Sequence, residues 1–149
     1  MNTPAKLLGT LQQHWGWSGL QAREIIGRNA FGNLLVIDDQ GLYWRICPEE
    51  LFCGIAAQTA EEFARLSETE EFRLDWDMER LVEKARRHVG ALDAGWVYCF
   101  VIPPVFGGAY EVDNIKAVPI EQLVAFSGDW AQEIKDLPDG AQIKLRVID

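Results

Sequence analysis

The chain has 149 residues, of which 48% are hydrophobic and 11% aromatic, and this is enough apolar content for one compact domain with its own core. Its 23 acidic residues outnumber its 14 basic ones and give a formal net charge of −9. This balance argues against direct binding to nucleic acid, because a phosphate backbone must be neutralised by clustered Lys and Arg. We find neither a membrane-spanning apolar run nor a signal-peptide pattern, and we expect a cytoplasmic protein with no membrane partner.

The first 28 residues are expected to form an N-terminal helical segment. Leu7, Leu8 and Leu11 recur at helical spacing, and Ser18 is placed to cap a second helix that ends near Gly27. Residues 29–149 are expected to form the main domain, in one structural unit with the helical segment.

Several short runs of the main domain predict β-strands. Residues 33–37 and 42–46 flank a Gly-containing turn, which is typical of a hairpin, and a third short strand is expected near residues 52–56. Residues 96–102 and 115–118 predict two more strands, because these runs are short and rich in aromatic and β-branched side chains.

Helical patterns lie between these strands. Thr59 fits the N-cap of a short helix whose first turn carries acidic residues. An apolar stripe over residues 78–89 predicts a longer helix, which Asp75 or Asp77 would cap and Gly90 would end.

The end of the chain completes the predicted fold. Pro119 is placed to begin a helix that continues to Ile134. Residues 137–140, with the sequence LPDG, predict a turn, and the alternation over 143–147 predicts a last strand. The pattern as a whole predicts an α+β fold: a single domain with a mostly antiparallel sheet and helices packed on it.

Residues 59–79 form an acidic segment with eight acidic residues and two basic ones, a local balance of −6. Charge runs are usually solvated faces. The indole between two carboxylates in this segment nevertheless suggests a binding surface for a basic protein. The residues assigned to this partner-binding surface are Glu61, Glu62, Glu68, Glu70, Glu71, Asp75, Trp76 and Asp77.

The sequence contains no complete catalytic or metal-binding motif. Asp75, Asp77 and Glu79 imitate the start of a calcium loop, but Arg80 stands where that loop needs glycine. Ser127 lacks the leading glycine of a nucleophile elbow and falls within a predicted helix. We therefore expect no catalytic residue, no metal and no cofactor, and the three cysteines are expected to be reduced and packed.

A set of short motifs resembles a known family in its order and spacing. These motifs are Asn29-Ala30-Phe31-Gly32-Asn33-Leu34, Tyr43-Trp44, Pro103-Pro104-Val105-Phe106-Gly107-Gly108-Ala109-Tyr110, Asp113-Asn114-Ile115 and Leu137-Pro138-Asp139-Gly140. From about Asn29 to Ile143 the chain is similar to the C-terminal domain family of type VI secretion DNase immunity proteins. The resemblance implies that the fold is determined in part by Gly107, Gly108, Tyr110, Asn114, Pro138 and Gly140.

The resemblance also implies a function. It points to a non-enzymatic immunity protein, or antitoxin, that binds a cognate antibacterial effector and protects the producing cell in interbacterial competition. The effector would typically be a nuclease, whose active site is electropositive because it holds a polyanion. The acidic segment would then be its docking face.

Two other functions stay open. One is a non-enzymatic regulatory or scaffold module that binds another basic protein through the same acidic face. The other is a hydrolase of unrecognised type. A hydrolase predicts a deep pocket with convergent polar groups and perturbed acids, whereas an immunity protein predicts a flatter patch.

Overall fold

The computed structural model describes residues 4–137, and this part of the chain contains five α-helices and six β-strands. The helices are α1 (Pro4–Trp15), α2 (Ala60–Ser67), α3 (Glu70–Asp77), α4 (Glu79–Val89) and α5 (Ile120–Ile134). The strands are β1 (Ala22–Arg28), β2 (Leu34–Asp38), β3 (Tyr43–Cys47), β4 (Phe52–Ala57), β5 (Trp96–Phe100) and β6 (Ile115–Pro119).

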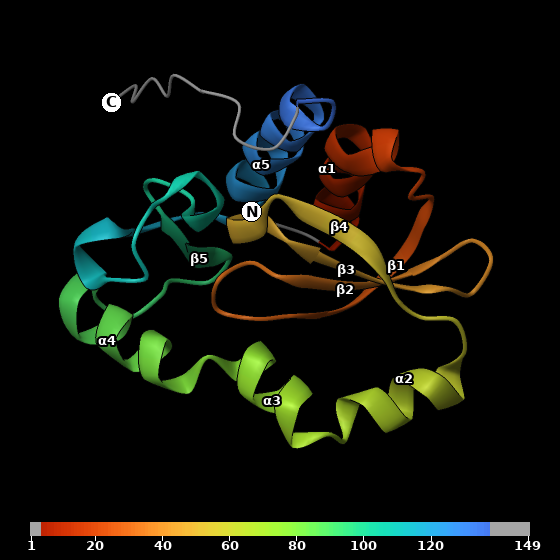
Figure 1. Cartoon of the computed structure of the whole chain (residues 1–149), viewed down its shortest axis with the longest axis horizontal. Coiled ribbons are helices and arrows are strands. Elements are labelled where there is room, and N and C mark those ends of the chain that lie inside the picture. The colour runs from red at the N-terminus through yellow and green to blue at the C-terminus, as the bar shows by residue number, and fades with distance from the viewer. Residues whose placement is uncertain (1–3, 138–149) are drawn as a thin grey trace.

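The strands form two antiparallel sheets, which confirms the predicted α+β fold. Strands β1 to β4 follow one another in a four-stranded sheet, and β5 pairs with β6 in a two-stranded one. Helices α1 and α5 lie side by side on one side of the larger sheet, while α2, α3 and α4 form an arc on the other side (Figure 1). This arc and the sheet face beneath it make up the candidate functional site.

Alternation along β2 and β3 separates the two faces of the larger sheet. Leu34, Val36, Trp44 and Ile46 are buried in the main core, together with residues of α1 and α5. The residues between them in sequence, such as Arg45, project from the opposite face, toward the arc. A second core cluster joins α4 to the smaller sheet and contains Phe31, Ala85, Tyr98, Phe100 and Ile115.

The N-terminal segment contains one helix instead of the two that were predicted. Residues 22–28 form β1, which pairs antiparallel with β2, so the helix predicted from Ser18 to Gly27 is wrong. Ser18 lies in a short 3-10 turn, where its hydroxyl donates to the carbonyl of Trp15 at 2.6 Å. The open edge of β2 offers backbone hydrogen bonds to this segment, and its β-branched Ile25 suits a strand.

The predicted capping of α4 is also wrong. Asp75 and Asp77 lie within α3, a helix that was not predicted, and α4 begins directly after Met78 without a side-chain cap. Thr69 caps α3 by accepting a hydrogen bond from Phe72 N at 3.1 Å.

Met78 joins α3 to α4 in a left-handed backbone conformation, with φ of 47°. Its N–H donates to the carbonyl of Leu74 at 3.2 Å, and its carbonyl accepts from Val82 N at 2.9 Å. The chain therefore changes direction at one residue while backbone hydrogen bonding continues on both sides.

The remaining predicted elements are confirmed within the described residues. These are α1, the hairpin β2–β3, β4, α2 with Thr59 as its N-cap, the end of α4 at Gly90, β5, β6 and α5 after Pro119. The predicted strand over 143–147 and Pro138 and Gly140 of the predicted turn lie outside the described residues.

The loop between β5 and β6 is held by glycine and by one asparagine. Gly107 has φ of 93°, and a Cβ added to Gly108 would lie 1.8 Å from the carbonyl oxygen of Ile102. The Asn114 side chain accepts from Ile102 N at 2.9 Å and donates to the carbonyls of Ile102 and Ala109 at 2.8 and 3.0 Å. These contacts fit the structural role that the resemblance implied for Gly108 and Asn114.

We expect Gly108→Ala to lower the free energy of unfolding by about 2–4 kcal/mol, because backbone must move to admit the new methyl group. Gly107→Ala is the matched control, since its Cβ would meet open space and only its positive φ is strained, at about 1 kcal/mol. Chemical denaturation of both variants measures the difference. Equal losses would show that the close approach to Ile102 does not constrain the loop.

Candidate functional site

The acidic residues predicted to bind a partner lie along α2, α3 and the turn between them. All seven are exposed, and we call this surface the acidic arc: Glu61, Glu62, Glu68, Glu70, Glu71, Asp75 and Asp77. Trp76, the eighth predicted residue, is half-buried. The structure therefore brings the predicted residues together on two short consecutive helices.

The inner side of the arc is aromatic. Ring centroids of Tyr43 and Phe63 are 4.6 Å apart, those of Phe63 and Phe72 are 6.4 Å apart, and those of Phe72 and Trp76 are 6.1 Å apart. This row of rings fastens α2 and α3 to the sheet, although neither helix has a fully buried residue. The Trp76 carbonyl also accepts a hydrogen bond from Asn29 Nδ2 at 2.9 Å.

Arg45 on β3 is the polar contact between the sheet and α3. Its Nη1 lies 2.5 Å from Asp75 Oδ2, and its Nη2 donates to Asn33 Oδ1 at 3.1 Å. The guanidinium carbon lies 5.9 Å from the ring centroid of Phe72 and 5.3 Å from that of Trp76, within the range of cation–π attraction. Asp75 is thus already paired within the protein.

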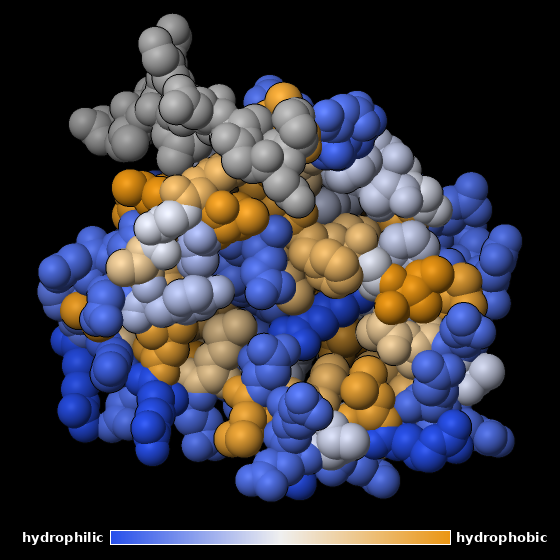
Figure 2. Space-filling view, viewed as in Figure 1, coloured by the Kyte–Doolittle hydropathy of each residue, from blue (hydrophilic) through white to orange (hydrophobic). Residues whose placement is uncertain are grey.

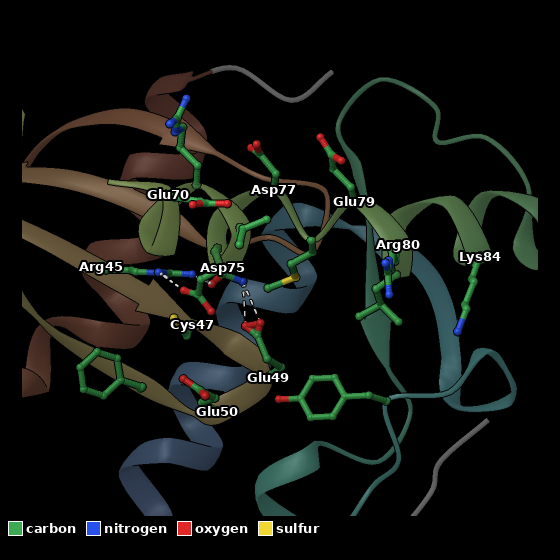
Figure 3. Close-up of a pocket in the computed structure, with 17 residues that line it drawn as sticks. Arg45, Cys47, Glu49, Glu50, Glu70, Asp75, Asp77, Glu79, Arg80 and Lys84 are labelled. Atoms are coloured by element: carbon green, nitrogen blue, oxygen red, sulfur yellow. Dashed lines mark hydrogen bonds and ion pairs between the residues drawn. The ribbon is translucent and has the colours of Figure 1, made fainter. Parts of the chain in front are cut away.

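A cleft with a volume of about 1330 Å³ separates part of the sheet from α3 and α4. Figure 2 shows this face hollowed at its centre, with hydrophilic side chains inside the hollow. The cleft lining contains six acidic residues and four basic ones. Arg45 and Asp75 meet at one side, whereas Arg80 and Lys84 project from α4 at a distance from Glu49 (Figure 3).

Glu49 is the most buried acid of the cleft. It lies in the 3-10 turn Pro48–Glu50 and is only 8% exposed. Nδ2 of Asn33 donates to both of its carboxylate oxygens, at 2.7 and 2.8 Å. Burial raises the pKa of Glu49 to about 7, against the lowering effects of the Asn33 hydrogen bond and the Arg45 charge.

The cleft is not the flat patch expected of an immunity protein, and its perturbed acid is a feature expected of a hydrolase. Its lining nevertheless contains no Ser, Thr or His. Burial raises the pKa of the Cys47 thiol to about 12, which keeps it protonated and unreactive. The lining therefore has no hydroxyl or thiol nucleophile paired with a histidine base. Within residues 4–137 no group of three or more His, Cys, Asp or Glu side chains could hold a metal.

Asn33, Arg45 and Glu49 were not predicted as site residues from the sequence. One signal was present in β3, where Arg45 falls between two residues that face the core, Trp44 and Ile46. A charged residue at that position must project from the other face, where solvent or an aromatic or acidic side chain can stabilise its charge. Nothing comparable in the sequence marks Glu49.

We expect Arg45→Ala to release α3 from the sheet while the rest of the fold stays intact. Amide hydrogens of α3 should exchange roughly tenfold faster, because the helix loses its ion pair and both cation–π contacts. Arg73→Ala is the control, since Arg73 is an exposed arginine of the same helix. Faster exchange over the whole protein, or none in α3, would contradict this role.

We expect Glu49→Gln to stabilise the protein at pH 8 by about 1–3 kcal/mol. The folded-state pKa is raised, so wild-type stability is greatest below the unfolded value near 4.5 and falls as pH rises to about 7. The variant carries no charge to bury, and its advantage should vanish near pH 4. Urea denaturation from pH 4 to 8 tests this, with exposed Glu50→Gln as a control that changes little. A variant less stable than wild type at pH 8 would refute it.

No helix among the described residues is long and apolar enough to cross a membrane. The sequence matches no curated protein. In fold the chain is similar to the crystal structure of Atu4351 from Agrobacterium tumefaciens, with a TM-score of 0.57 and 15% identity. That similarity covers 86% of this chain and 65% of Atu4351, and it shows a shared fold.

The family model described as "T6SS immunity protein Tdi1, C-terminal" matches residues 57–131, half of the chain. The match begins at the end of β4 and covers the acidic arc, α4, the smaller sheet and most of α5. It is narrower than the range from Asn29 to Ile143 expected from the motifs, and it includes Gly107, Gly108, Tyr110 and Asn114. The chain therefore belongs to the family of the T6SS immunity protein Tdi1, C-terminal domain.

Proposed function

We propose that this protein binds and neutralises a cognate type VI secretion effector, a nuclease, in the cytoplasm of the producing cell. Neutralisation occurs by protein–protein contact through the acidic arc. Membership of an immunity family supports the role, and the row of exposed carboxylates on the family-matched helices supports the position of the contact.

The charge of the arc is available to a partner. Glu61, Glu68, Glu70, Glu71 and Asp77 form no ion pair with any described residue, whereas Asp75 is paired with Arg45. A nuclease must carry a positive surface to hold DNA or RNA. Opposite charge on the immunity protein raises the rate of encounter and keeps nucleic acid from the same surface.

Co-expression with the effector encoded beside its gene tests the function itself. Growth of a cell that makes the effector should be rescued, and the two proteins should purify as a stoichiometric complex. An inactive nuclease variant of the effector keeps the cells alive for the binding measurement. Absence of both the rescue and the complex would refute the proposed function.

We expect the triple reversal Glu68→Lys, Glu70→Lys and Glu71→Lys to slow association with the effector by about 10- to 100-fold at low salt. Wild-type association should slow steeply as salt rises, and the variant should show little of that dependence. Stopped-flow kinetics over a salt series measures both quantities.

The control for this reversal is Glu24→Lys, Asp39→Lys and Glu133→Lys, three exposed acids outside the arc with the same total change of charge. It should slow association by less than about threefold, because local charge at the contact counts more than net charge. Equal slowing by both triple variants would show that net charge, and not the acidic arc, controls docking.

A further inference from the structure

Glu49 is a buried carboxylate whose capacity to accept hydrogen bonds is not completely used. A carboxylate offers about four acceptor sites, and the amide nitrogen of Asn33 together with the backbone N–H of Glu49 supplies at most three donors. None of the basic residues lining the cleft forms an ion pair with Glu49 in the described part of the chain. Arg45 is bonded to Asp75 and Asn33, and Arg80 and Lys84 project elsewhere (Figure 3).

The surroundings of Glu49 favour a cation over an anion. Acidic residues outnumber basic ones in the cleft, and Glu50 follows Glu49 directly in the same turn. The effect extends to Tyr110 on the rim, whose pKa is raised by burial and further by the charges of Glu49, Glu50 and Asp75. An anion would meet this negative potential, whereas a cation would neutralise it.

Large hydrophobic side chains stand at the cleft from three separate parts of the chain. Phe52 of β4 is 48% exposed, Leu74 of α3 is 66% exposed and Tyr110 of the β5–β6 loop is 52% exposed. Single exposed hydrophobic residues are common on protein surfaces. Here three such residues line one cleft together with a buried acid. The hydrophobic side chains match the aliphatic stem of a Lys or Arg side chain, and the acid matches its charged head.

The volume of the cleft favours a ligand larger than a typical small molecule. Pockets for small molecules typically measure about 300–1,000 Å³. A cleft of about 1330 Å³ exceeds that range and has room for a short segment of polypeptide.

We propose that the cleft receives a loop of the effector and that one arginine or lysine of this loop binds Glu49, with its stem against Phe52, Leu74 and Tyr110. This inference rests on the proposed function and adds a second contact to it. The acidic arc attracts the effector from solution, and the cleft holds it once docked. The two contacts differ in kinetics, because exposed charges mainly govern association and a buried charge pair mainly governs dissociation.

The test is surface plasmon resonance of the catalytically inactive effector on wild-type protein, Glu49→Gln and Leu74→Ser. Both variants should dissociate about tenfold faster or more, with association rates within about threefold of wild type. Glu133→Gln on α5, an exposed acid outside the cleft, should leave both rates unchanged. If the effector dissociates from Glu49→Gln at the wild-type rate, the inference is overturned while the proposed function stands.

The same measurement at pH 8 and pH 6 separates a direct charge contact from a structural effect. Lowering the pH from 8 to 6 protonates Glu49 and should weaken effector binding by wild-type protein about tenfold. The same change of pH should not weaken binding by Glu49→Gln in this way, because that variant has no carboxyl group to titrate at this position. Arg45 and Glu50 are the charged groups that act on Glu49, and Cys47 and Tyr110 are titratable groups on which its charge acts. Both proteins share all four. A ratio of affinities that does not change with pH would exclude the proposed contact.

An effector that does not bind at all would refute the proposed function and leave the cleft to be tested alone. The probe is then n-butylguanidinium chloride, titrated by NMR against wild-type protein and Glu49→Gln, with uncharged n-butylurea as its control. Saturable shifts of cleft resonances in wild type only, and only with the cation, would support a cation site. Equal shifts in both proteins, or none, would overturn it.

Discussion

The attachment of Arg45 to α3 is the contact on which the candidate site depends. Arg45 leaves the sheet face opposite the main core, so any partner for it must come from outside the core, and α3 supplies Asp75 and two aromatic rings. Helix α3 forms one wall of the cleft and carries part of the acidic arc, and Glu70, Asp75 and Asp77 belong to both. The ion pair and ring contacts of one largely buried arginine, together with the row of aromatic rings, thus set the position of both surfaces relative to the sheet.

The fold could be predicted wherever local chemistry and tertiary pairing agree. Thr59 with its following acids, Pro119 before an apolar helical stripe and the hairpin turn after Asp38 all specify their elements locally. The wrong predictions arose where contacts with distant parts of the chain determine the secondary structure. Residues 22–28 fit either a helix or a strand by their apolar spacing, and only the free edge of β2 makes them a strand. Helix α3 was missed although Thr69 and the two acids after it repeat the pattern at Thr59.

The candidate site divides in the same way. The exposure of the carboxylates could be predicted from the sequence, because a dense run of like charges stays in contact with solvent. Glu49 could not, because its burial depends on Asn33 and on α5 and the loop after β5, which contact its turn and lie far away in the sequence. The family match ends short of this part of the site, since Asn33, Arg45 and Glu49 all precede residue 57. Neither composition nor family membership alone reveals the floor of the cleft.

The left-handed joint at Met78 has a consequence for the thermodynamics of association. Segments that fold only when they bind lose conformational entropy at that moment, which lowers the affinity gained per unit of contact area. Here the joint is closed by backbone hydrogen bonds on both sides, and the row of aromatic rings holds the preceding helices in place. The backbone that carries the carboxylates is ordered before a partner arrives, so the entropic cost of recognition falls mainly on side chains.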